Sequence, residues 1–196
     1  VNSHESSRPT GYNRTYPNYI AAEAARGTEF NAWSNGNPPM HETILPFTRL
    51  LGGPMDYTPG IFEIKMSHYD ATKKEQVHTT LAKQLALYVT MYSPLQMAAD
   101  LPENYEKYPD AFQFIKDVAA DWDESKYIEA EPGDYLTVVR KTKGKESWFL
   151  GAITDENPRK TEIKLDFLTP NKKYKAIIYQ DGITADWQKN PINYEI

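Results

Sequence analysis

The sequence predicts an α/β part followed by an all-β part. Its 196 residues suffice for one large domain or two small ones with a core. Charge divides the chain, because residues 1–123 hold 10 basic and 15 acidic side chains whereas residues 124–196 hold 12 of each. The first lysine is Lys65. Because lysine is rarely buried, the residues before it are expected to be interior, interfacial or site-forming.

Strand–loop–helix order characterises the first 62 residues, where short apolar runs alternate with turn signals. Val1–Ser3 and Tyr19–Ala22 are predicted to be short strands. Glu42–Leu51 is predicted to be a helix that ends at Gly52 and Gly53. This order is typical of α/β units, whose functional residues gather on the loops after the strands.

Two further helices are predicted before residue 123. Thr79–Ala99 has apolar residues at helical spacing along one face, and Pro94 bends or interrupts its end. A second helix is predicted from Pro109, a favourable first-turn residue, to Ala119.

Strand-length segments rich in aromatic and β-branched residues follow Trp122, separated by turn signals. Five such segments at roughly ten-residue spacing predict an antiparallel sheet or sandwich. They are Tyr127–Ala130, Tyr135–Lys141, Ser147–Thr154, Thr161–Phe167 and Tyr174–Gln180. Ile192–Ile196 is expected to be another strand, and both ends of the chain are interpreted as cut.

Composition excludes several classes of protein. The apolar share of 40% and charged share of 25% are those of a soluble globular protein. The absence of cysteine excludes disulfides, Cys-ligated zinc and thiol catalysis. Mean hydropathy is −0.68, and neither a membrane span nor a signal peptide is expected in this chain. The net charge of −5 argues against a nucleic-acid partner.

Three carboxylates lie amid turns and aromatic residues: Glu5, Glu23 and Glu29. Gly27 allows the chain to turn between the last two, so that both can converge on one site. Converging carboxylates either hold a hard cation such as calcium or divide acid and base roles at a glycosidic bond. The alternative, which the residues alone favour, is that each glutamate is a solvated charge or pairs with a nearby arginine.

Other side chains give weaker signals. The four histidines show no metal-binding spacing, although His4 beside Glu5 is a candidate contact for a polyol. Trp33 and Tyr57 are candidates for stacking on sugars. No phosphate-binding glycine motif and no serine-hydrolase motif is present, which makes nucleotide binding and serine hydrolysis poor candidates.

Five ordered blocks in the first 60 residues carry a resemblance to a known family: His4–Gly11, Arg14–Asn18, Glu23–Glu29, Leu45–Arg49 and Gly53–Gly60. In these blocks the chain resembles glycoside hydrolase family 97. The remainder agrees more weakly and mainly in architecture.

The resemblance implies α-glucosidase or α-galactosidase activity in a much longer, periplasmic or secreted enzyme. Such enzymes join a β-sandwich domain, a (β/α)8 barrel and a C-terminal β-domain, with calcium in the site. Residues 1–123 are therefore expected to be the C-terminal part of the barrel. Residues 124–196 are expected to be a truncated antiparallel β-sandwich domain.

The same resemblance assigns roles to four residues. Glu29 matches the general acid, and Glu5 matches the general base of the inverting branch. Glu5, Glu23 and Glu29 are placed together around calcium. His4 is the expected contact to a substrate hydroxyl.

The resulting hypothesis is hydrolysis of α-glucosidic bonds in starch-derived oligosaccharides, with inversion and with calcium. The expected partners are the oligosaccharide and the missing N-terminal portion of the enzyme, with self-association through exposed edges. This segment alone is expected to be inactive. Three alternatives stay open: a retaining α-galactosidase, a non-catalytic carbohydrate-binding module and a structural fragment without a ligand.

Overall fold

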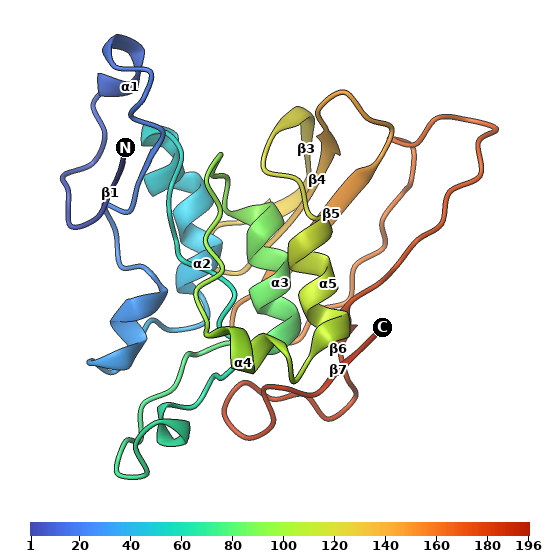
Figure 1. The fold of residues 1–196 in the computed structure, drawn as a ribbon. Coiled ribbons are helices and arrows are strands. Elements are labelled where there is room, and N and C mark those ends of the chain that lie inside the picture. Colours follow the sequence, from blue (N-terminus) through green and yellow to red (C-terminus); the bar gives the residue numbers. More distant parts are fainter.

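A computed structural model describes all residues from Val1 to Ile196. Helix α3 (Leu81–Thr90) lies at the centre of the molecule (Figure 1). A three-stranded sheet packs on one side of α3, and the N-terminal segments lie on the other. No helix has the length and apolar character needed to cross a membrane.

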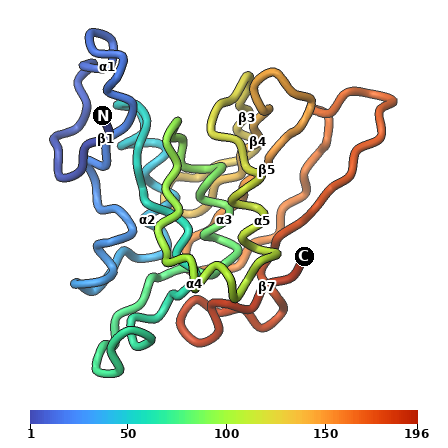
Figure 2. The backbone as a smooth tube through the Cα atoms, in the orientation of Figure 1, coloured from blue at the N-terminus to red at the C-terminus, as the bar shows by residue number.

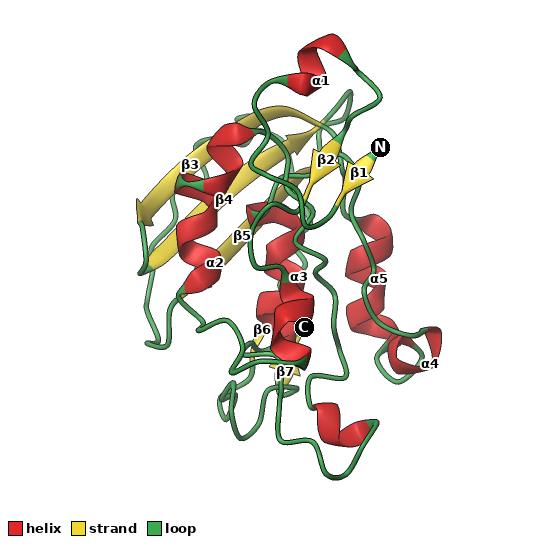
Figure 3. Cartoon of the chain, turned by 90° about the vertical axis from the view of Figure 1, so that its left-hand side faces the viewer, coloured by secondary structure: helices red, strands yellow, loops and turns green.

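The N-terminal segments pair in parallel. β1 (Asn2–Ser3) lies beside β2 (Ala21–Ala22), as Figure 3 shows, and Ala22 forms a parallel bridge with Met55 on its other side. The strands expected at Val1–Ser3 and Tyr19–Ala22 are therefore present but shorter. Helix α1 (Tyr12–Thr15) lies in the connection between β1 and β2.

The helix predicted at Glu42–Leu51 is broken into three pieces. They are α2 (His41–Ile44) and two 3-10 turns, η2 (Leu45–Phe47) and η3 (Arg49–Gly52). Pro46 explains the break, because it has no N–H to donate to the Glu42 carbonyl and its ring crowds that carbonyl. Two further 3-10 turns are η1 (Thr28–Ala32) and η4 (Met66–His68).

Helix α3 begins where the Thr80 hydroxyl accepts a hydrogen bond from the Lys83 amide. It ends at Thr90, well before the predicted Ala99, because Pro94 disfavours helical backbone in the residue ahead of it and cannot join an α-helix interior. Two helices follow, α4 (Pro102–Tyr105) and α5 (Pro109–Asp117). The helix predicted from Pro109 is confirmed, whereas α4 was not predicted.

The sheet contains β3 (Trp122–Glu131), β4 (Tyr135–Thr142) and β5 (Trp148–Thr154) in antiparallel order. The first three predicted strands of the β-rich part are thus confirmed. A separate antiparallel pair joins β6 (Gln180–Asp181) to β7 (Tyr194–Glu195).

The predictions at Thr161–Phe167 and Tyr174–Gln180 are wrong as stated. The first contains no strand, and only the last residue of the second, Gln180, is paired. Residues 155–180 extend away from the sheet (Figure 2) and are mostly exposed. Strand propensity in these segments has no neighbouring strand to satisfy it, and a strand exists only by pairing.

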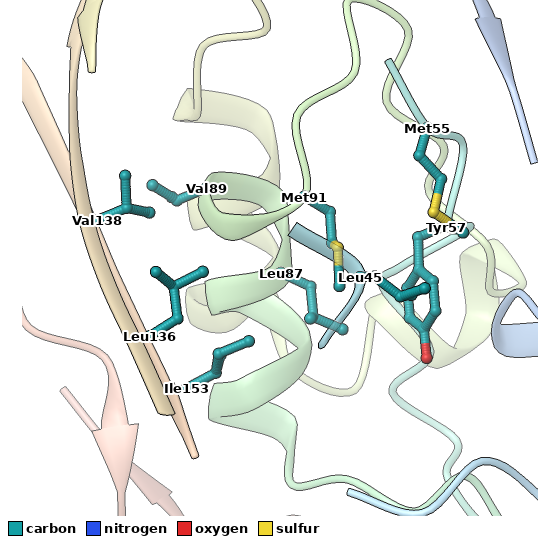
Figure 4. Packing of buried hydrophobic residues seen from close by; sticks show 9 residues of the cluster. All are labelled: Leu45, Met55, Tyr57, Leu87, Val89, Met91, Leu136, Val138 and Ile153. Atoms are coloured by element: carbon teal, nitrogen blue, oxygen red, sulfur yellow. The ribbon is translucent and has the colours of Figure 1, made fainter. Parts of the chain in front are cut away.

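The main hydrophobic cluster joins the two parts of the chain. In Figure 4, Leu136, Val138 and Ile153 point from the sheet toward α3, while Met55 and Tyr57 lie on the far side of the helix. The other members are Leu45, Leu87, Val89 and Met91. Burial of this kind stabilises by about 25 cal/mol per Å² of apolar surface.

Close contact between α3 and the sheet depends on Gly151 in β5. A Cβ atom there would lie 2.8 Å from Val89 Cβ and 3.0 Å from the Ala86 carbonyl oxygen. A second cluster, which includes Leu81, Leu85 and Ala111, packs α3 against α5. Helix α3 is therefore buried on several faces rather than on one.

Candidate functional site

Each of the three parallel segments is followed by a polar side chain. His4 comes after β1, Glu23 after β2, and Asp56 after Met55. Because parallel neighbours present their carboxyl ends at one edge, these side chains start from adjacent positions.

His4, Glu23 and Glu29 converge at that edge. Each offers one ligand atom, and these atoms lie within 4.8 Å of one another. His4 Nδ1 is 3.7 Å from Glu23 Oε2 and 4.0 Å from Glu29 Oε1. The Glu23 side chain is 7% exposed, whereas that of Glu29 is 46% exposed. The arrangement therefore combines one inner carboxylate with one that solvent or a ligand can reach.

Asp56 holds the other side of the His4 ring. Its carboxylate is buried, and Oδ2 lies 2.8 Å from His4 Nε2 and accepts a hydrogen bond from Asn2. The hydrogen bond with Asp56 raises the pKa of His4, burial lowers it, and the charges of Glu23, Asp56 and Glu29 raise it further, so that the net shift is upward. Protonated His4 is thus the partner that these carboxylates favour.

Glu29 reaches the cluster from η1, which is anchored through its first residue. The Thr28 amide and hydroxyl both donate to the Tyr57 carbonyl, at 3.1 and 3.0 Å. Gly27, just before η1, leaves room for the Glu23 carboxylate, since a Cβ atom there would lie 2.6 Å from Glu23 Oε1. The turn expected at Gly27 is present, and close approach rather than positive φ requires the glycine.

Glu5 approaches the cluster through its backbone. Its amide donates to Glu23 Oε2 at 3.3 Å, but its residue is exposed and its carboxylate is not a member of the cluster. The structure thus brings together three of the four predicted residues by their side chains and the fourth by its amide. The catalytic and metal-binding roles assigned to Glu5, Glu23, Glu29 and His4 stay predictions.

Left-handed backbone is concentrated at the same edge. Glu5, Ala24 and Thr58 have φ of 52°, 45° and 55°, and only one other non-glycine residue in the chain has positive φ. Such conformations cost about 1–3 kcal/mol each and persist where the surrounding structure enforces them. Each of the three lies one or two residues from His4, Glu23 or Asp56.

No lysine or arginine forms an ion pair with Glu5, Glu23 or Glu29. The alternative in which arginines neutralise these glutamates is therefore wrong. His4 alone faces Glu23, Glu29 and Asp56 within 4.0 Å. Carboxylate oxygens suit a hard cation, and the two at this site fit part of a calcium shell of six to eight oxygens. The same donors suit acid–base chemistry at a glycosidic bond.

Two other predicted side chains behave differently. Trp33 is 63% exposed and free to contact a ligand, but Tyr57 is buried with its hydroxyl bonded to Glu42, so its prediction as a sugar-stacking residue is wrong. Asp56 was missed as part of the site. It follows an apolar residue within the Gly53–Gly60 block, and its position after a short strand was the available signal.

Comparison with known proteins shows which proteins this chain is similar to. Residues 121–196 match the family model described as glycosyl-hydrolase 97 C-terminal, oligomerisation. Two solved structures of glycoside hydrolase family 97 enzymes from Pseudoalteromonas sp. strain K8, one in complex with panose and one with acarbose, superpose on the whole chain with TM-scores of 0.92. They are 50% and 51% identical to it.

Among curated proteins, a retaining alpha-galactosidase from Bacteroides thetaiotaomicron is 36% identical over 93% of the chain. A probable retaining alpha-galactosidase from Streptomyces bingchenggensis is 34% identical over 77% of it. The chain spans 28% and 22% of the length of these two relatives and 30% of each Pseudoalteromonas chain.

Proposed function

The chain belongs to glycoside hydrolase family 97, and we propose that it carries part of the active site of an enzyme that hydrolyses α-glucosidic bonds in oligosaccharides. The observation that carries this proposal is the convergence of Glu23 and Glu29 on His4 with no arginine or lysine to neutralise them. Panose and acarbose, bound by the similar Pseudoalteromonas enzymes, support oligosaccharides as the substrate class.

Glu29 acts in this proposal as the general acid. Its side chain is the more exposed carboxylate of the cluster and can reach the oxygen of the leaving sugar. Glu5 acts as the general base that takes a proton from the attacking water, which gives inversion. The two carboxyl groups of an inverting enzyme stand about 6.5–9.5 Å apart, which leaves room for that water. His4 donates to a hydroxyl of the substrate.

Calcium, when bound, supplies positive charge beside the reacting sugar, and Glu5, Glu23 and Glu29 are the residues that would hold it. Glu23 suits an inner ligand because its side chain is nearly buried. Since these carboxylates are fewer than calcium requires, we propose that other parts of a longer enzyme supply the remaining oxygens.

In this proposal residues 1–123 form the C-terminal part of a (β/α)8 barrel, and residues 124–196 belong to a β-sandwich domain. The parallel pairing of β1, β2 and Met55, with polar residues at their carboxyl ends, supports the barrel. The antiparallel sheet of β3, β4 and β5 supports the sandwich.

A retaining α-galactosidase is the second candidate, and the names of the two curated relatives favour it. The stereochemistry of the product separates the two candidates. We expect the complete enzyme to release glucose from panose first as the β-anomer, and proton NMR during the reaction detects this anomer. We also expect a calcium chelator to abolish the activity. Release of α-galactose from an α-galactoside would instead establish the retaining enzyme. Binding of panose without hydrolysis would identify a carbohydrate-binding module.

We also propose that residues 121–196 contribute to self-association, as the description of the matching family model suggests. A groove of about 620 Å³ between α5 and residues 175–179 supports this, because exposed Ile177 and Ile178 line it. Replacing Ile178 by Asp should lower the mass measured by light scattering. An unchanged mass would exclude this groove as the interface.

A further inference from the structure

Arg49 is buried without an acidic partner. It is 5% exposed and forms no ion pair, yet its guanidinium donates to four backbone carbonyl groups. Burial lowers the pKa of Arg49 from its ordinary value, so holding this charge is costly. The carbonyl contacts offset that cost, which indicates that the side chain is placed to join pieces of backbone.

The four carbonyl groups belong to two neighbouring stretches of chain. Nε donates to Glu23 at 2.9 Å, Nη2 to Ala22 at 2.6 Å and to Pro54 at 3.3 Å, and Nη1 to Gly53 at 3.1 Å. Ala22 is the last residue of β2 and Glu23 follows it, whereas Gly53 and Pro54 come just before Met55, which pairs with β2. The planar guanidinium of Arg49 therefore joins these two stretches of backbone.

Backbone hydrogen bonds pass from these stretches into the site. The carbonyl of Ala22 accepts from the Asp56 amide at 3.2 Å as well as from Arg49. The Glu23 amide donates to the Ser3 carbonyl at 2.9 Å, next to His4. Arg49 thus fixes the backbone from which the Glu23 and Asp56 side chains project.

We infer that Arg49 is a positioning residue for this site, which acts through the backbone of Glu23 and of the segment before Asp56 to keep the Glu23 carboxylate beside His4. This inference rests on the proposed function, because the site that it positions is the proposed one. A lysine cannot replace the arginine, because an ammonium group is a point donor whereas the guanidinium presents donors in a rigid planar fork.

The test compares Arg49→Lys with Arg140→Lys in the complete enzyme. Arg140 is a matched control because it is also 5% exposed and also donates to a backbone carbonyl, that of Val89, at 2.7 Å. Its other partner is Ser125, and neither partner belongs to the site. Both variants are expected to lower the melting temperature.

Only Arg49→Lys is expected to weaken calcium binding and to lower kcat, each by about 10–100-fold. Losses of this size are typical when a residue that orients a metal ligand is replaced. KM for panose should change less than kcat. Equal kcat and calcium affinity in the two variants would overturn the inference while leaving the proposed function intact. A wild-type enzyme that neither binds calcium nor hydrolyses panose would instead overturn the proposed function, and the inference with it.

Amide hydrogen exchange of the wild-type enzyme measures how firmly the backbone at Glu23 and Asp56 is held. This measurement requires no variant and no activity assay. The amides of Glu23 and Asp56 should exchange as slowly as that of Met91 at the end of α3, which donates to Leu87. Exchange as fast as that of exposed residues 159–162 would show that the backbone is not fixed here and would contradict the role of Arg49.

Discussion

His4 Nε2 lies 2.8 Å from Oδ2 of Asp56, a carboxylate that is 1% exposed. Because this contact occupies Nε2, the ring turns Nδ1 toward Glu23 and Glu29. The orientation of the histidine in the site is therefore set by a residue that no substrate needs to touch.

Asp56→Asn should lower kcat/KM for an α-glucoside by about 10–100-fold, because partners that orient site residues have effects of this size. Circular dichroism should show an intact fold. Asp100→Asn is the matched control, since Asp100 also accepts backbone amides but lies between Phe62, Glu63 and Leu101, away from the site. Wild-type activity in the Asp56 variant would show that His4 needs no such support.

Gly27→Ala should displace the Glu23 carboxylate, because the added Cβ would lie 2.6 Å from Glu23 Oε1. We expect weaker calcium binding in titration calorimetry with a small change in melting temperature. Gly151→Ala should behave in the opposite way, since its Cβ would meet Val89 at 2.8 Å and overpacking costs about 1–3 kcal/mol. Unchanged calcium affinity in Gly27→Ala would mean that Glu23 is not a ligand.

Lys83→Met should destabilise the fold by about 3–5 kcal/mol, because it leaves a buried charge on Glu42 without its partner. The two groups lie 3.3 Å apart and their side chains are 11% and 2% exposed. The contact lacks hydrogen-bond geometry, since the ammonium group donates to the Pro39 and Thr154 carbonyls instead. Urea unfolding measures the loss, and the double variant with Glu42→Gln should recover much of it. No recovery would indicate that the carbonyl contacts dominate.

Asp100 should make stability depend on pH in the acid range. Burial raises the pKa of Asp100, but hydrogen bonds from Glu63, Asn104, Leu101 and Phe62 outweigh it, so the net shift is below the ordinary value of 3.8. The ionised form is thus favoured by folding, and its contribution is present above pH 3.8 and lost as pH falls through the lowered pKa. Unfolding free energies of wild type and Asp100→Asn should differ at pH 7, and the difference should shrink as the pH falls below 3.8. A difference independent of pH would contradict this.

The sequence predicted elements whose signals are local. Pro109 starts α5 as expected, and segments rich in β-branched and aromatic residues, separated by turn signals, correctly placed β3, β4 and β5. Prediction from the sequence failed where pairing with residues distant in the sequence decides whether a strand forms. Thr161–Phe167 has strand composition, but pairing requires a neighbour that periodicity cannot reveal.

For the site, Gly27 showed that the chain could turn so that Glu23 and Glu29 converge, although the residues alone favoured solvated or arginine-paired glutamates. The two carboxylates do converge. The roles of Asp56 and Arg49 were not predictable from spacing, because both act through contacts between separate stretches of backbone. The positive φ of Glu5 was also not predictable from the sequence, because glutamate rarely adopts this conformation and only the folded chain enforces it.

The most direct test of the proposed site compares the activity of Glu29→Gln, in the complete enzyme, on substrates with poor and with good leaving groups. A general acid assists a poor leaving group far more than a good one, by about 100-fold or more. We therefore predict that the variant loses most activity on maltose while retaining most activity on an activated nitrophenyl α-glucoside. Equal losses on the two substrates would contradict the assignment of Glu29 as the acid and, with it, the sugar-cleaving role of the cluster.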